Sequence, residues 1–348
     1  MGCYFHKARF DSRKADNSEK KEYSWDKRCK VNSSDYLVQD IIDSEVVRLP
    51  GSVNGQQFII QNCKNSTFYI LDHMNAVVID DCLDCKIVLG AVKGSVFLRD
   101  CKECVCIVAC GQFRARDCRK LDIFLCCPTR PVLESSGSIH FGCYQLFYSG
   151  LEDHFSKTNL SAFNNEWSNI HDFTPIDGED NWCLLPDTLS INDYISTPES
   201  EKTAQLGLTF SAEKSVVPHT WGPHKIISGQ VCLVIFFFDG HQSLRVNKFI
   251  NKMKMDNPEC LLLLSKEKQM SSRDAELVFK SSAYNNVVTD GHVVGLQFCG
   301  PNCIQVCEKI ISRLNKGESD LIHITTNATT SHQQADLFFN ASMNAICS

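Results

Sequence analysis

Short stretches of alternating apolar and polar residues recur along the first half of the chain. Three of them end in Asp-Cys: Val77-Val-Ile-Asp-Asp-Cys82, Val96-Phe-Leu-Arg-Asp-Cys101 and Phe113-Arg-Ala-Arg-Asp-Cys118. Cys63, Cys82, Cys101 and Cys118 follow one another at intervals of 19, 19 and 17 residues. Alternation indicates a β-strand, and a short fixed period is typical of coils that bury one face on the next. The repeat therefore predicts a stack of β-strand coils.

The alternation also divides each phrase into an inner and an outer side. A fourth version, Pro131-Val-Leu-Glu-Ser-Ser136, follows the same pattern with serine in place of the cysteine. The inner side is predicted to line the core and consists of Val77, Ile79, Val96, Leu98, Phe113, Ala115, Pro131 and Leu133. The outer side is predicted to face solvent or a partner. It carries the charged residues Asp80, Arg99, Arg116 and Glu134 and a row formed by Val78, Phe97, Arg114 and Val132. Arg114 is either an ordinary surface arginine or the charged centre of a protein-binding patch, and the pattern leaves both open.

The second half of the chain has a different pattern, in which strands and helices alternate. Apolar runs predict strands over 231–238, 260–264 and 293–298, and helical spacing predicts helices over 243–253, 273–281 and 303–314. This order indicates a small α/β sandwich. We expect four regions: a flexible segment over 1–30, the coils over 31–175, a linker over 176–228 and the α/β domain over 229–348. The tail beyond Leu321 is polar and weakly patterned.

Composition limits the class of protein. The chain has 348 residues, 43% of them hydrophobic, and a net charge of −6, so it offers no general case for nucleic-acid binding. The longest apolar run, Val231 to Phe238, has 8 residues, which is short of the ~20 that a transmembrane helix needs. The chain has 20 cysteines and begins without an apolar signal sequence, so we expect a reducing compartment.

The cysteine pairs raise the alternative of a zinc site. Cys82-Leu-Asp-Cys85 and Cys101-Lys-Glu-Cys104 have the spacing of zinc ligands. The equivalent places in the neighbouring coils, however, hold Ser66 and Leu121. Because a ligand position would not change to serine and leucine in the same repeat, we expect buried free cysteines and no metal site.

The amino terminus carries an acylation signal. Gly2 after the initiator Met is an acceptor for N-myristoylation, and Cys3 is a candidate for S-palmitoylation. Two acyl chains give a stable membrane anchor where one does not, and nearby basic residues add attraction to an anionic surface. The usual motif has Ser or Thr at position 6, where this chain has His6. The alternative is a tail whose Gly-Cys is accidental.

Four stretches within residues 1–175 carry a resemblance to the tubulin-cofactor-C domain family: Met1–Cys3, Gly51–Phe58, Val92–Val96 leading to Cys110–Lys120, and Phe163–Pro175. The second half is more loosely similar to nucleoside diphosphate kinase. The resemblance implies a right-handed parallel β-helix followed by a ferredoxin-like α/β sandwich. Kinase activity is not expected, because His241 and His292 lack the Asn-X-X-His-Gly-Ser setting of the kinase nucleophile.

The resemblance also implies a function. By this resemblance the chain is expected to be a GTPase-activating protein for small GTPases of the ADP-ribosylation-factor-like class. The partner GTPase carries the GTP and Mg²⁺, so the chain needs no cofactor of its own. Arg114 matches the arginine finger, Glu134 a carboxylate that orients it, and Gln112 a further catalytic position. The nucleotide-contacting positions match Gly94, Ser95, Gly111, Gln112, Phe113 and Arg114, and Phe173 matches an aromatic that packs on the GTPase.

Gly111 departs from the family pattern, which has Gln-Gln-Phe-Arg where this chain has Gly-Gln-Phe-Arg. The loss of the first glutamine side chain leaves a second hypothesis open. In it the chain is a GTP-dependent effector or scaffold that binds the GTPase without stimulating hydrolysis, and tubulin is a further candidate partner. By resemblance we expect the chain at the cytoplasmic face of the plasma membrane and at the cilium and its base, acting in the transport of lipidated proteins.

Overall fold

The computed structural model describes residues 33–340, apart from 177, 179, 187, 200, 224, 226, 227 and 315–320. The predicted acylation sites Gly2 and Cys3 lie outside the described residues. The chain divides into Met1–Asp35 and Tyr36–Ser348. The description below concerns the second unit.

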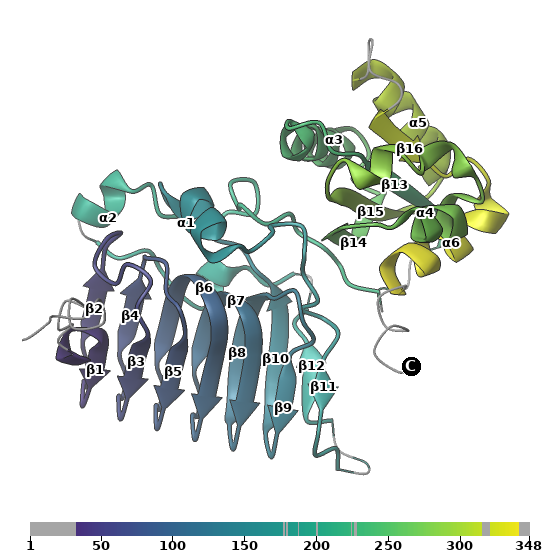
Figure 1. Cartoon of the computed structure of the whole chain (residues 1–348). Helices are drawn as coiled ribbons and strands as arrows, with labels where there is room; N and C mark the ends of the chain where they lie inside the picture. Colours follow the sequence, from purple (N-terminus) through teal and green to yellow (C-terminus); the bar gives the residue numbers. More distant parts are fainter. Residues whose placement is uncertain are drawn as a thin grey trace, which may run out of the picture. The chain divides into compact units, whose positions relative to one another are not determined.

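The first part of this unit is a parallel β-helix (Figure 1). Its strands are β1 (Leu37–Gln39), β2 (Glu45–Arg48), β3 (Phe58–Gln61), β4 (Thr67–Ile70), β5 (Val77–Asp80), β6 (Lys86–Arg99), β7 (Val105–Arg116), β8 (Arg119–Cys126), β9 (Val132–Glu134), β10 (Gly137–Cys143), β11 (His171–Asp172) and β12 (Trp182–Leu184). The predicted coil stack is therefore confirmed.

The strands form two parallel strips. One strip, which we call the open sheet, runs through β1, β3, β5, β6, β7, β9 and β11. The other, the covered sheet, runs through β2, β4, β6, β7, β8, β10 and β12. The long strands β6 and β7 belong to both, because the first half of each pairs within the covered sheet and the second half within the open sheet.

The corners of the coils explain the Asp-Cys repeat. Asp81 and Asp84 adopt left-handed backbone angles, with φ of 50° and 52°, which aspartate tolerates better than most residues. Cys82 follows Asp81, and its buried thiol donates to the carbonyl oxygen of Asp80 at 3.4 Å. Ser66 and Ser136 make the same contact with their hydroxyl groups at 2.8 and 2.9 Å. Each such corner thus carries a small side chain with a donor, which is why serine can replace cysteine.

Burial confirms the inner side of the alternation. Phe113 and Leu98 are fully buried in the core between the two sheets, together with the other predicted inner residues of the four phrases. The cysteines of the coils are buried as well, and of the cysteines in the described part of the chain only Cys183 is exposed.

The outer face of the covered sheet carries a second layer. Leu151 and Phe155 of α1 (Leu151–Thr158) pack there against Tyr69, Val88 and other outward residues of the strands. The range predicted as a linker, 176–228, contributes β12 to the covered sheet. It also contains two short helices, η2 (Ile191–Asp193) and α2 (Glu201–Gln205), and buries Ile191, Ile195, Leu208, Phe210 and Val217 in this layer.

The C-terminal part is an antiparallel sheet with the strand order β14-β15-β13-β16. The strands are β13 (Gln230–Phe236), β14 (Leu261–Lys268), β15 (Val293–Gly300) and β16 (Ile322–Ile324). The helices are α3 (Gln242–Asp256), α4 (Ser272–Phe279), α5 (Cys303–Leu314) and α6 (Ala328–Asn340), with the 3-10 turns η3 (Ser282–Tyr284) and η4 (Val287–Thr289). A further 3-10 turn, η1 (Ser33–Tyr36), precedes β1.

This arrangement confirms the predicted ferredoxin-like sandwich. Side chains of α3 and α5 cover one face of the sheet, and those of α4 and α6 cover the other. The weakly patterned tail beyond Leu321, for which no element was predicted, supplies β16 and α6. None of the described helices is both long and apolar enough to cross a bilayer.

Phe113 tests the core of the β-helix. Phe113→Ala is expected to lower the free energy of unfolding by about 3–5 kcal/mol, because it leaves a cavity between the sheets. Phe173→Ala is the matched control, since the Phe173 side chain is 60% exposed, and its effect should stay within about 0.5 kcal/mol. Urea unfolding followed by circular dichroism measures both. Equal losses in the two variants would contradict the inward orientation of Phe113.

Candidate functional site on the open sheet

The outer face of the open sheet brings the predicted partner-binding residues into one row. Cα register places Ile59 beside Val78, Val78 beside Phe97, Phe97 beside Arg114, Arg114 beside Val132 and Val132 beside His171. We call this set the apolar row. Its apolar members are half-buried and Arg114 is exposed. None of them belongs to a hydrophobic cluster among the described residues, so this face has no second layer of the kind that covers the other sheet.

A charged row runs beside the apolar row, two residues further along each strand. It consists of Asp80, Arg99, Arg116 and Glu134, and the uncharged Gln61 continues it beside Asp80. Arg99 donates from Nη2 to Oδ2 of Asp80 at 2.5 Å. Nε of Arg116 lies 3.3 Å from Oδ2 of the neighbouring Asp117. Both arginines of the charged row are therefore paired with carboxylates.

Phe97 lies at the centre of three guanidinium groups. The Cζ atoms of Arg99, Arg114 and Arg116 lie 5.7, 5.6 and 5.8 Å from the centroid of its ring. At this distance the negative face of an aromatic ring attracts a cation. Arg114 differs from the other two, because in the described part of the chain it has no hydrogen-bond or ion-pair partner. The ring of Phe97 thus holds an arginine whose five donors are all free.

The predicted nucleotide-contacting positions lie beside the middle of the apolar row, two or three residues before Phe97 and Arg114 along β6 and β7 and on the side opposite the charged row. Ser95 and Gln112 are in register, and the hydroxyl of Ser95 donates to Oε1 of Gln112 at 3.2 Å. Gly94 precedes Ser95 and donates its backbone N–H to Asn75 O at 2.8 Å. Gln112 and Arg114 are both exposed and lie on the same face of β7, because they are two residues apart in a strand.

One predicted site residue needs correction. The side chain of Phe113 is fully buried in the core, since alternation turns it away from Gln112 and Arg114, so that side chain cannot contact a nucleotide. Glu134 lies beside Arg116 in the register, as the repeat predicts, and within the described residues it forms no ion pair with either arginine. Its role in orienting Arg114 stays a prediction.

Gly111 lies where two strands approach very closely. A Cβ atom at this position would come within 2.5 Å of Lys93 O and 3.2 Å of Gly94 O. The register between β6 and β7 shifts at this point, between Val92 and Ser95. Gly111 therefore has a structural role: the absence of a Cβ atom allows the backbone of β7 to approach that of β6 closely beside Gln112.

Phe173 continues the face beyond the last strand. Its backbone N–H donates to Leu133 O at 2.9 Å, and its ring lies edge-on to that of His171 with 4.4 Å between centroids. With a 60% exposed side chain, it is among the most exposed large hydrophobic residues of the described chain. An exposed aromatic beside an apolar row is typical of a protein-binding surface.

The sequence did not reveal the whole face. Ile59 and His171 extend the apolar row beyond the residues that the repeat marks. The outward places of Asp80, Arg99 and Arg116 were predicted, because these residues occupy the same point of successive phrases, and the register confirms that they form one row. His171 follows a long excursion out of the coil, and no periodicity marks it.

The β-helix with its arginine-centred face defines a class of protein. The family model "Tubulin binding cofactor C" matches residues 55–173, which span β3 to β11. Among curated proteins, Tubulin-specific chaperone C of Pongo abelii is 29% identical over 150 residues, covering 42% of this chain and 43% of that protein. The first domain is thus a domain of the tubulin-cofactor-C type.

The match to Protein XRP2 of Homo sapiens extends over the whole chain. It is 42% identical over 346 residues and covers 98% of this chain and 98% of the human protein. The chain therefore belongs to the Protein XRP2 family.

Two solved structures each match about a third of the chain. Tubulin Binding Cofactor C from Leishmania major matches with a TM-score of 0.31 and 28% identity, covering 34% of this chain and 82% of that chain. A nucleoside diphosphate kinase family protein from Babesia bovis matches with a TM-score of 0.28 and 12% identity, covering 32% of this chain and 90% of that chain.

The close approach at Gly111 predicts a cost for any side chain there. Gly111→Ala should lower the free energy of unfolding by about 1–3 kcal/mol, because the carbonyl groups of Lys93 and Gly94 have to move. Gln112→Ala, the exposed neighbour, should change it by no more than about 0.5 kcal/mol. Urea unfolding measures both, and a neutral Gly111→Ala variant would refute the close contact.

Proposed function

We propose that the protein is a GTPase-activating protein for a small GTPase of the ADP-ribosylation-factor-like class, and that Arg114 is its arginine finger. The observation that carries the proposal is the state of Arg114. It is exposed, lies on Phe97, and has none of the carboxylate contacts that hold Arg99 and Arg116. An arginine that must enter a partner's nucleotide site has to be positioned without being neutralised, and an aromatic ring achieves this.

The chemistry of GTP hydrolysis requires this kind of group. Negative charge spreads over the transferred phosphoryl group and the leaving oxygen, and a guanidinium supplied in trans stabilises it. The planar fork of donors fits two phosphate oxygens at once, which a lysine ammonium cannot do. In this proposal the partner carries the GTP and Mg²⁺. Gln112 and Ser95, next to the finger, are placed to contact the nucleotide or the attacking water.

The remainder of the open face would dock the GTPase. Val78, Phe97 and Val132 flank the finger, and Phe173 extends the surface at one end. Apolar anchors around a central arginine have the composition of an interface centre, with the charged row as its polar rim. The same surface would exclude water from the finger once the partner is bound.

The proposal also includes where the protein acts. Acylation at Gly2 and Cys3 would anchor it to the cytoplasmic face of the plasma membrane and to membranes of the cilium and its base. There it would act in the transport of lipidated proteins, by returning a GTPase that controls their carrier to its GDP state.

Gly111 favours a second candidate. Gly111 has no side chain to contact the nucleotide, and the close approach of the Lys93 carbonyl leaves no room for one. A face that docks a GTP-loaded GTPase without completing the catalytic site would make the protein an effector or scaffold. Tubulin is a further partner to consider, given the name of the matching domain family.

Single-turnover GTP hydrolysis separates these candidates. The full chain should accelerate hydrolysis by an ADP-ribosylation-factor-like GTPase by about 10³–10⁵-fold, and Arg114→Ala should lose nearly all of that acceleration. Arg114→Lys should recover little, because it restores the charge without the fork. Binding of the GTP-loaded GTPase by Arg114→Ala should remain within a few-fold of wild type, because the finger acts mainly in the transition state.

Arg116→Ala is the matched control, since it lies on the same strand and contacts the same ring. It should keep most of the acceleration, and both variants should unfold at the wild-type urea concentration. Tight GTP-dependent binding without acceleration by the wild-type chain would refute the activator and establish the effector.

A further inference from the structure

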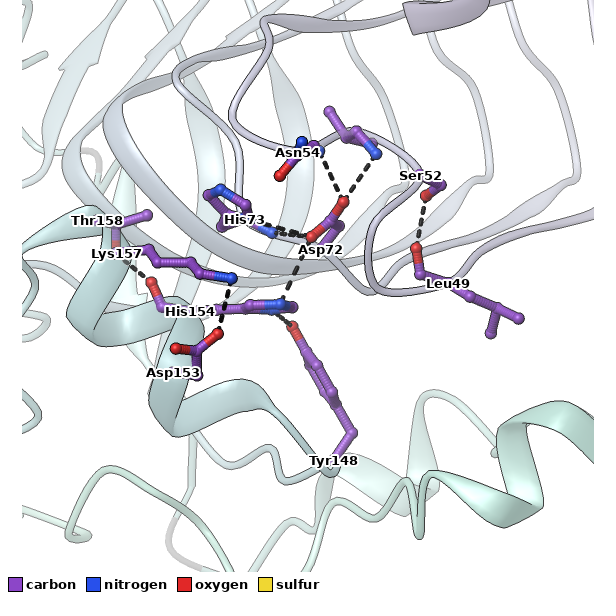
Figure 2. Close-up of polar contacts among 11 residues, drawn as sticks. Leu49, Ser52, Asn54, Asp72, His73, Tyr148, Asp153, His154, Lys157 and Thr158 are labelled. Atoms are coloured by element: carbon purple, nitrogen blue, oxygen red, sulfur yellow. Dashed lines mark hydrogen bonds and ion pairs between the residues drawn. The ribbon is translucent and has the colours of Figure 1, made fainter.

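A buried cluster of one carboxylate and two imidazoles lies away from the open sheet. Asp72 follows β4, His73 is the next residue, and His154 reaches toward them from α1 (Figure 2). Oδ1 of Asp72 lies 3.1 Å from Nδ1 of His73 and 3.5 Å from Nε2 of His154. All three atoms lie within 4.8 Å of one another. This cluster contains no cysteine, whereas the cysteine pairs were the only metal-ligand spacing that the sequence displayed.

The surroundings hold the carboxylate rigidly. Oδ2 of Asp72 accepts the backbone N–H groups of Val53 and Asn54, both at 2.7 Å, and Oδ1 accepts that of His73 at 2.8 Å. Burial acts to raise the pKa of Asp72, but the N–H groups that donate to it outweigh burial and keep the pKa below its ordinary value. The carboxyl group is therefore a buried anion aimed at two imidazoles.

The charge of that anion has no basic side chain to balance it. Among the described residues, only His73 and His154 pair with Asp72. A buried charge is normally paired or coordinated to a cation. A neutral imidazole keeps a lone pair on one nitrogen and is a common metal ligand.

The far nitrogen of His154 has the contact that metal-binding histidines usually make. Nδ1 of His154 lies 2.9 Å from the hydroxyl of Tyr148, on the side of the ring away from Asp72 (Figure 2). If Nδ1 carries the hydrogen and donates it to Tyr148, Nε2 faces Asp72 as an unprotonated ligand. Such an outer contact fixes the tautomer and the ring orientation of a ligating histidine.

We propose that Asp72, His73 and His154 bind one divalent transition-metal cation of the zinc type. A tetrahedral ion with bonds of about 2.0–2.1 Å separates its ligand atoms by about 3.3–3.4 Å, close to the 3.1 and 3.5 Å that join Asp72 to the two rings. Two nitrogens and one oxygen suit zinc or cobalt better than calcium or magnesium.

The cation would replace the hydrogen between Asp72 and His73 and join parts of the fold that lie far apart in the sequence. His73 is 15% exposed at its side chain, whereas His154 is 4% exposed. A turn of the His73 ring would bring its nitrogen to the ion, and water reaching this side would fill the remaining position. The bound ion would fix α1 to the covered sheet and to the loop of Val53 and Asn54.

Cobalt titration of the full chain, first freed of metal with a chelator, tests the site. Co²⁺ bound by nitrogen and oxygen gives a visible absorption without the thiolate charge-transfer band that cysteine ligands would add. We expect one Co²⁺ per chain with that spectrum, displaced by Zn²⁺. His73→Gln and His154→Gln should each weaken binding at least tenfold, and Tyr148→Phe by about 10–100-fold.

His140→Gln is the control, because His140 contacts Asp122 at 2.7 Å in a simple pair outside the cluster; it should bind Co²⁺ like wild type. Urea unfolding in the presence of chelator shows whether each variant folds without metal. If His154→Gln does not fold, the His73→Gln variant decides the test, because His73 is partly exposed and its substitution disturbs the core less. Absence of stoichiometric binding, a thiolate spectrum, or unchanged affinity in the folded histidine variants would overturn the proposal.

Discussion

Backbone hydrogen bonds between successive coils set the place of every side chain on the β-helix. Each strand is held in parallel register on the next, so residues at the same point of the repeat form straight rows across the sheet. Left-handed residues at the corners, such as Asp81 and Ser135, are followed by a thiol or hydroxyl that bonds back to the chain, and together they turn each coil toward the next strand. Alternation then decides which rows enter the core and which face outward.

The outer faces of the two sheets differ in burial. Outward apolar side chains of the covered sheet are buried under α1 and the segment around Ile191 to Val217. Those of the open sheet remain half-buried around Arg114 and Phe97, with two further arginines neutralised nearby. A rigid sheet that presents one unpaired guanidinium suits a finger that must reach a fixed point in a partner, because little freedom is lost when it docks.

The sequence was sufficient for the features that depend on the repeat. It predicted the coils, the inward side of each strand and the row from Val78 to Val132, because these depend only on period and alternation. It failed where distant segments meet or where no period exists: the layer over the covered sheet, the elements β16 and α6, the approach of Gly111 to Lys93, and the cluster of Asp72 with His154.

Hydroxyl-radical footprinting with the GTPase tests the central claim, that the open sheet is the docking face, most directly. It labels exposed side chains and compares the chain alone, with GDP-loaded GTPase, and with GTPase carrying a non-hydrolysable GTP analogue. The account predicts protection of Phe97, Val132 and Phe173 in the GTP-analogue complex alone, with Leu244 and Met255 of α3, which are 60% and 78% exposed, labelled as before. Unprotected Phe97 and Phe173 together with protected Leu244 and Met255 would contradict it.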